Sequence, residues 1–378
     1  MTGQPSRRLR VGLHVGQLAQ PIPGGIGRVT EMLCAELPRH ADVVAFASCP
    51  PYRRGRIRAR VNGVAEFRGL GVLPPQWCYE VWQRRRRRID LGVDVCHAPS
   101  LAIPPTRAPL VVTVNDVAFI RHPEMFTAHG ARFHERALAI ARREAAAIIV
   151  PSAFTLTELV HEGFEPARIH HVPLTASAPL GCGSRDAEQH LRSLGVREPF
   201  LLAVGTVEPR KNYETIVAVL AHVRGRIPEV SLVVAGNPGW NGTPAASGLE
   251  AAGVVFVGPV RDDELDFLYR RAKIVLNASI YEGFGLTVLE AMARGCAVVA
   301  SDIPAHGEVG GGGVRLVPAR DVDAWADVIC RLLVDRGARA RLGRLARERS
   351  GRFTLARTVA GHLTAYNSVV PGDPPLPC

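Results

Sequence analysis

The feature of this sequence that most constrains its fold is a regular alternation of short apolar, β-branched runs with longer amphipathic stretches. Strands that alternate with helical patterns in this way are typical of βαβ units, in which a parallel sheet carries helices on its faces. The expected strands of the first half are residues 9–16, 43–48, 93–98, 110–115, 147–152 and 169–173; those of the second half are 200–205, 231–236, 254–258, 273–278, 297–301 and 314–317. The sequence therefore predicts an α/β protein with doubly wound parallel sheets.

Two domains are the natural division, because 378 residues exceed what one hydrophobic core usually organises. A stretch rich in Ala, Ser, Gly and Pro, residues 175–184, separates the two sets of strands. We expect an N-terminal Rossmann-like domain over residues 1–178 and a C-terminal one over 199–353. A final helix is expected over 354–369, and the proline-rich tail 371–378 is expected to be disordered.

Composition narrows the class of protein. No apolar run reaches the roughly 20 residues of a membrane span, and the polar, basic start resembles no signal peptide, so we expect a cytoplasmic protein. The eight cysteines are scattered and form no zinc-type pairs with histidine, so no metal and no other cofactor is expected. The net charge of +11 comes almost entirely from arginine, since Lys211 and Lys273 are the two lysines in the chain.

The positive charge by itself fits nucleic acid, an anionic membrane or phosphorylated small molecules. No nucleic-acid recognition module is evident, so a nucleic-acid partner is not expected. Five consecutive arginines, residues 84–88, follow Trp77, Tyr79 and Trp82. They fit either peripheral contact with the inner face of the membrane or a solvated surface.

The most informative motif is the segment from Tyr281 to Gly295, which follows one expected strand and opens a helix. A glycine-containing turn from strand to helix directs free backbone N–H groups at an anion. Residues 283–286, Gly283, Phe284, Gly285 and Leu286, are thus candidates to hold a pyrophosphate. Glu282 in the turn and Glu290 in the helix are candidates to accept hydrogen bonds from sugar and ribose hydroxyls; helix capping and a solvated helix glutamate explain the spacing equally well.

A second motif, Gly205 to Asn212, also follows an expected strand directly. Gly205 permits a close approach, and Arg210 and Lys211 bring two positive charges to the carboxyl end of the sheet, where open α/β sheets bind their ligands. An ordinary basic loop is the alternative.

The glycine-rich turn at residues 24–28 follows the first strand and contains Gly25, Gly27 and Arg28. It only loosely matches a dinucleotide-binding fingerprint. No acidic ribose-binding residue ends the second expected strand, which disfavours a dehydrogenase.

Taken together, these motifs resemble the retaining family 4 glycosyltransferases of GT-B fold, over residues 9–369. The most specific element of the resemblance is the pair Glu282 and Glu290, set in Glu-Gly-Phe-Gly and followed by Glu-Ala-Met-Ala. The motifs around Gly25, around Arg210 and at residues 301–308 reinforce it, as does the segment 112–116, which is similar to the family's acceptor-side loop.

The resemblance implies a hexosyltransferase that moves a sugar from a nucleotide-sugar donor to a hydroxyl acceptor, which is a small molecule, a lipid-linked compound or a glycan. Arg210 and Lys211 would bind the donor pyrophosphate and offset charge on the leaving nucleotide. Glu282 would contact the donor sugar and Glu290 the ribose, and Gly25, Gly27 and Arg28 would bind phosphates. Family members work without a divalent metal and retain the anomeric configuration. Retention can proceed through a covalent enzyme nucleophile or through front-face substitution, and the resemblance favours the second. UDP and GDP donors both stay open.

One residue departs from the family pattern. Asn115 stands where the family usually has histidine, and asparagine can donate a hydrogen bond but cannot carry a proton. This departure keeps open a non-transferring homologue or regulatory subunit that binds nucleotide sugar. A nucleotide-sugar epimerase on the same fold is the enzyme alternative.

Overall fold

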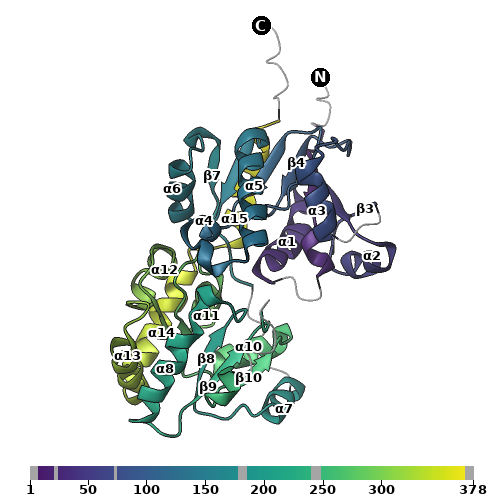
Figure 1. Cartoon of the computed structure of the whole chain (residues 1–378). Helices are drawn as coiled ribbons and strands as arrows, with labels where there is room; N and C mark the ends of the chain where they lie inside the picture. The colour runs from purple at the N-terminus through teal and green to yellow at the C-terminus, as the bar shows by residue number, and fades with distance from the viewer. Residues whose placement is uncertain (1–6, 21–23, 72–74, 178–184, 240–247, 371–378) are drawn as a thin grey trace, which may run out of the picture. The chain divides into compact units, whose positions relative to one another are not determined.

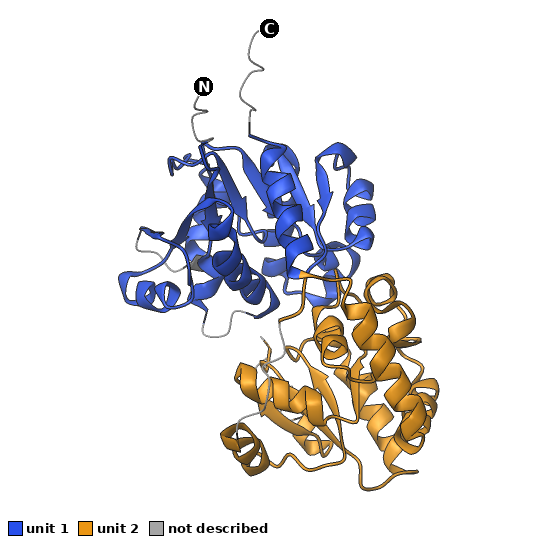
Figure 2. Ribbon diagram, turned by 180° about the vertical axis from the view of Figure 1, so that it is seen from behind, with its two compact units in different colours: residues 1–174, 355–378 blue, residues 175–354 orange. Residues whose placement is uncertain are grey.

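The computed structural model describes residues 7–20, 24–71, 75–177, 185–239 and 248–370. It forms two compact units, Met1–Leu174 with Leu355–Cys378 and Thr175–Thr354 (Figure 2). The tail 371–378 and most of the expected linker lie outside the described residues.

Unit 1 contains a seven-stranded sheet in which every neighbouring pair is parallel. In spatial order the strands are β3 (Glu66–Leu70), β2 (Asp42–Ser48), β1 (Arg10–His14), β4 (Val95–Ala98), β5 (Leu110–Thr113), β6 (Ala147–Val150) and β7 (Ile169–His171). Its helices are α1 (Gly24–Glu36), α2 (Pro51–Arg58), α3 (Pro75–Arg84), α4 (Ala118–Arg121), α5 (Ala128–Glu144), α6 (Ala153–His161) and α15 (Leu355–Asn367), and they flank the sheet (Figure 1).

Unit 2 repeats this plan with six parallel strands. Their order is β10 (Val255–Gly258), β9 (Ser231–Ala235), β8 (Phe200–Val204), β11 (Ile274–Asn277), β12 (Val298–Ser301) and β13 (Arg315–Val317). The helices named here are α7 (Arg185–Ser193), α8 (Tyr213–Arg224), α10 (Asp262–Arg271), α11 (Leu286–Ala293), α12 (Pro304–Gly310), α13 (Val322–Val334) and α14 (Arg336–Ser350).

Every strand expected from the sequence is present, usually one or two residues shorter at its end. One strand was missed, β3. It is an edge strand that pairs with β2 alone, and its sequence, with Arg68 and Gly69 among half-buried residues, has no apolar run to mark it.

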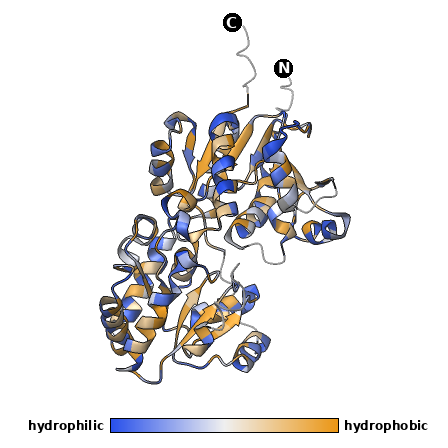
Figure 3. Ribbon diagram, viewed as in Figure 1, coloured by the Kyte–Doolittle hydropathy of each residue, from blue (hydrophilic) through white to orange (hydrophobic). Residues whose placement is uncertain are grey.

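The strands form the cores, and Figure 3 shows them mostly in the hydrophobic colour. Residues such as Val11 and Leu13 of β1 and Leu201 of β8 are fully buried, as continuous apolar runs in parallel strands require. The helix α15 packs on β6 and β7 of unit 1. Its Thr358 hydroxyl donates to the Pro173 carbonyl over 2.8 Å, and Tyr366 is hydrogen-bonded to the buried His97 of β4.

The strand order reverses between β1 and β4 in unit 1 and between β8 and β11 in unit 2. Loops that leave the carboxyl ends of two such strands diverge to opposite sides and open a crevice, which is where doubly wound sheets bind ligands.

Candidate functional site

In unit 2 the first loop at this reversal leaves β8 and carries Arg210 and Lys211 on a short 3₁₀ turn, Pro209–Lys211. Asn212 ends the turn with φ of +54°. Its side-chain amide donates to the carbonyls of Ala278 and Ala319 over 3.1 and 2.9 Å, and its oxygen accepts from the Thr215 hydroxyl over 2.9 Å. These three bonds hold the left-handed conformation and so fix where the two preceding cations point.

The second loop leaves β11 and carries Glu282, whose side chain is almost completely buried. Lys211 Nζ donates to Glu282 Oε1 over 2.5 Å, and Arg210 Nη1 donates to Oε2 over 2.7 Å. The Ser279 hydroxyl lies 2.8 Å from the same Oε1. The structure therefore brings together three of the residues that the sequence nominated, although 71 positions separate Lys211 from Glu282.

The electrostatics of this cluster follow from its geometry. Burial alone would raise the pKa of the Glu282 carboxyl, but Lys211 and Arg210 oppose it and hold that pKa well below its ordinary value. Glu282 is accordingly a carboxylate at neutral pH, and both cations are oriented before any ligand arrives.

Arg210 has a second carboxylate partner that the sequence analysis did not nominate. Its Nη2 donates to Glu208 Oε1 over 2.7 Å, while Nη1 also reaches the Tyr281 carbonyl over 3.1 Å. The guanidinium is thus clamped on two sides. In the sequence, the one feature that distinguishes Glu208 as a candidate site residue is its position immediately before Pro209.

Beyond Glu282 the chain turns into α11 through Gly283, Phe284 and Gly285. Gly285 is the N-cap of α11 with φ of +97°, a conformation that favours glycine. Phe284 is buried and packs edge-on against Phe353 at 5.7 Å between centroids. The first backbone N–H groups of α11, from Leu286 onward, lie at the same end of the sheet as Lys211, an arrangement suited to an anion.

His306 of α12, which was not among the predicted site residues, lies directly behind this turn. A Cβ placed on Gly285 would be 3.1 Å from His306 Cδ2. The His306 Nδ1–H donates to the Ser301 carbonyl over 2.9 Å, which leaves Nε2 as an acceptor that is buried and has no hydrogen-bond partner among the described residues. Burial lowers the pKa of this imidazole, against the opposing effect of Glu282.

Glu290 lies in α11 and is 2% exposed. The Tyr269 hydroxyl donates to its Oε2 over 3.2 Å. Tyr269 therefore holds this carboxylate inside unit 2, and the contact of Glu290 with ribose stays a prediction.

The remaining candidate residues lie in unit 1. Gly25, Gly27 and Arg28 lie in the first turns of α1, where Gly25 is exposed, Arg28 is half-buried and Gly27 is buried. Asn115 follows β5 by two residues, and its Nδ2 donates to the Pro99 carbonyl beyond the end of β4 over 3.2 Å. Asp116 caps the next turn through the Ala118 amide. Asn115 is thus tethered at the carboxyl edge of the sheet.

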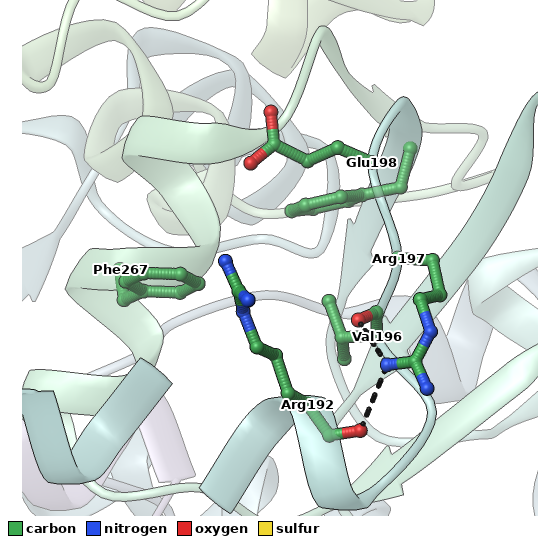
Figure 4. Close-up of a pocket in the computed structure, with 6 residues that line it drawn as sticks. Arg192, Val196, Arg197, Glu198 and Phe267 are labelled. Carbon is green, nitrogen blue, oxygen red and sulfur yellow. Dashed lines mark hydrogen bonds between the residues drawn. The ribbon is translucent and has the colours of Figure 1, made fainter. Parts of the chain in front are cut away.

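Two cavities of unit 2 lie away from this cluster. The larger of these two, about 440 Å³, lies at the opposite, amino edge of the sheet beside Phe200, the first residue of β8. Figure 4 shows Arg192 and Phe267 beside it, with the Arg197 guanidinium turned to the Arg192 and Val196 carbonyls. The candidate site is therefore defined by the hydrogen bonds of Glu282 and by the reversal of strand order, not by a cavity.

Two features are absent from the described part of the chain. Within it no group of three or more His, Cys, Asp or Glu side chains is arranged to hold a metal ion. None of its helices is long and apolar enough to cross a membrane.

Comparison with known proteins agrees with these observations. Residues 186–349 match the family model described as glycosyl transferases group 1, and residues 23–175 match that of glycosyltransferase family 4. A D-inositol 3-phosphate glycosyltransferase of Xylanimonas cellulosilytica is 30% identical over 94% of this chain and 95% of its own length. That of Salinispora arenicola is 35% identical over 57% of this chain, and the chain spans 50% of that relative.

Solved structures share the fold. The Anabaena protein HepE, crystallised with UDP and glucose, superimposes with a TM-score of 0.75 at 18% identity, covering 95% of this chain and 100% of that one. Sucrose-phosphate synthase from Thermosynechococcus elongatus gives 0.72 at 20% identity, with 95% and 98% covered. The chain therefore has the GT-B fold and belongs to the group 1 and family 4 glycosyltransferases.

Proposed function

We propose that the protein is an active, retaining glycosyltransferase of the hexosyltransferase type, which moves a sugar from a UDP- or GDP-sugar to a hydroxyl acceptor. The observation that carries the proposal is the cluster of Arg210, Lys211 and Glu282 at the reversal between β8 and β11. Two cations side by side can bind the two phosphates of a donor, and the carboxylate between them can accept hydrogen bonds from a sugar hydroxyl.

The proposed reaction needs no divalent metal. As the glycosidic bond breaks, negative charge grows on the diphosphate, and Arg210, Lys211 and the N-terminus of α11 would offset it. In front-face substitution the departing phosphate oxygen takes the acceptor proton, so the acceptor bonds to the face that the nucleotide leaves. This route requires no enzyme nucleophile, and we assign none.

A panel of nucleotide sugars tests the proposal. UDP-, GDP-, ADP- and TDP-sugars are incubated with the chain and with candidate acceptors, and released nucleotide and glycosylated product are measured. D-inositol 3-phosphate belongs in the acceptor set, because relatives are named for it, as do glycans, because another relative is named an O-antigen chain mannosyltransferase. NMR of the product determines whether the anomeric configuration is retained. Binding of a nucleotide without turnover of any donor would favour a non-transferring homologue, and epimerised donor would indicate an epimerase.

We also propose peripheral contact with an anionic membrane through α3. Its Trp77 is 67% exposed and Val81 42% exposed, and the side chain of Arg84 follows at 76%. An exposed aromatic next to basic residues is the composition that interfacial helices use. Co-sedimentation with phosphatidylglycerol vesicles should fall for Trp77→Ser; equal sedimentation of wild type and variant would contradict the proposal.

A further inference from the structure

A second cavity of unit 2, of about 230 Å³, lies at the amino edge of the sheet, away from Glu282. Lys273 and Ala297, which immediately precede β11 and β12, both line it. Its lining has no acidic residue but has these five cationic ones: Arg270, Lys273, Arg294, Arg336 and Arg339.

Two of these cations are fixed in place by buried or backbone partners. Arg294, whose side chain is 4% exposed, donates through Nε to Asp266 over 2.8 Å and through Nη1 to the Glu290 carbonyl over 3.1 Å. Arg339 Nη1 donates to the Leu332 and Leu333 carbonyls over 2.7 and 3.0 Å. Guanidinium groups held this way lose little further freedom when they bind an anion.

The local charges do not balance. Asp266 is shared by Arg270 and Arg294, and Glu198 lies 3.4 Å from Lys273. Within the ranges that the structure describes, neither Arg336 nor Arg339 forms an ion pair with a carboxylate. Arg336 is also the first residue of the 15-residue helix α14, whose N-terminus is already capped by the Asp335 carboxylate, which accepts from the Ala338 amide over 2.7 Å. Five cations line the cavity against the three nearby carboxylates of Asp266, Glu198 and Asp335, so positive charge accumulates in a concave site.

We propose that this cavity binds a small anion that carries one or two phosphate groups, at a site separate from that of the sugar donor. A guanidinium group can donate two parallel hydrogen bonds to two oxygens of one phosphate. The cavity, of about 230 Å³, is large enough to hold such an anion. The inference does not rest on the proposed function, because it concerns the opposite edge of the sheet.

The test uses inorganic diphosphate and isothermal titration calorimetry on the full chain. Diphosphate can also bind Arg210 and Lys211, so each titration is repeated in the Arg210→Ala, Lys211→Ala background. Arg294 and Arg339 support the surrounding structure, so the test changes the exposed Arg336 instead. Arg344→Glu is the matched control, since it makes the same charge change on an exposed residue of the same helix outside the cavity.

We expect Arg336→Glu to weaken diphosphate binding by at least about tenfold and Arg344→Glu by less than about twofold. The binding should persist in the Arg210→Ala, Lys211→Ala background and weaken as salt is added. Loss of all diphosphate binding in that background would overturn the proposal, as would equal effects of the two glutamate variants. Should Arg336→Glu fail to fold by circular dichroism, Lys273→Gln replaces it, and unchanged affinity in that variant would equally overturn the site.

Discussion

Lys211 Nζ lies 2.5 Å from Glu282 Oε1, so a lysine after β8 and a glutamate after β11 meet at the point where the strand order of unit 2 reverses. Both side chains are largely buried, at 13% and 10% exposed. A buried ion pair of this kind costs desolvation energy, and it persists here because Arg210 and Ser279 satisfy the same carboxylate. We interpret the cluster as a preformed site whose cations a diphosphate can share.

Replacing both Arg210 and Lys211 with alanine should strongly impair use of the donor. Each charge-assisted contact to a pyrophosphate is worth ~1.5–3 kcal/mol, so the value of kcat/KM for the donor should fall steeply. Arg226→Ala is the control, because it removes a half-exposed arginine that pairs with Asp327 on the surface. Turnover of the double variant at the wild-type level, with donor below saturation, would refute the phosphate assignment.

Glu282 should make the stability of the protein depend on pH. Its pKa is lower in the folded than in the unfolded chain, so the carboxylate contributes stability above the unfolded value and that contribution is lost as the pH falls toward the folded one. Urea unfolding of wild type and Glu282→Gln should therefore differ more at about pH 7 than at about pH 3. A difference that stays constant over this range would show that the carboxylate charge does not stabilise the fold.

The sequence could predict most of the fold because apolar runs mark buried parallel strands, and it failed at β3, an edge strand without such a run. It also nominated Arg210, Lys211 and Glu282, because each follows a strand and the carboxyl ends of parallel strands share one edge. It could not nominate His306 or Glu208. Their roles depend on which side chains tertiary packing places beside them, and the same is true of the basic cavity, whose lining residues come from separate helices and loops.

The turn before α11 should tolerate no side chain at Gly285. Gly285 has a φ of +97°, and a Cβ added to it would lie only 3.1 Å from His306 Cδ2. We therefore expect Gly285→Ala to lower the free energy of unfolding by ~1–3 kcal/mol. Gly307→Ala is the matched control: Gly307 lies in α12, and the nearest atom, Leu316 Cδ1, is 3.9 Å from its added Cβ. Equal unfolding midpoints for the two variants would show that the turn adapts.

Chelators should leave the rate of transfer unchanged. In the proposed mechanism the positive charge that offsets the negative leaving diphosphate comes from Arg210, Lys211 and the N-terminus of α11. The measurement is the initial rate with and without EDTA, at constant ionic strength, since salt screens the same charges. Loss of activity that Mg²⁺ or Mn²⁺ restores would contradict metal independence.

Asn115 gives the sharpest test of whether the chain transfers sugar, because it replaces the usual histidine of the family. Its Nδ2 donates to the Pro99 carbonyl, which holds the amide at the carboxyl edge of the unit 1 sheet. If this amide orients a sugar hydroxyl, Asn115→Ala should cost at least ~0.5–1.5 kcal/mol of transition-state stabilisation, measured from kcat/KM.

Two further variants separate the roles of Asn115. Asn115→Asp keeps the shape but replaces the donor to Pro99 with a carboxylate, so it should lose as much activity as Asn115→Ala or more. Asn115→His should help little in an active enzyme adapted to the amide. Should the wild type bind nucleotide without turnover, and Asn115→His then transfer sugar, the chain would be a homologue that lost activity at this position. We favour the active enzyme, because a site that no longer transfers sugar would be free to lose its donor-side residues. Arg210, Lys211, Glu282 and Glu290 are all present, and Glu282 contacts both cations. Turnover by Asn115→Ala equal to wild type at every donor concentration would contradict both interpretations and leave Asn115 as a loop residue that only ties β5 to Pro99.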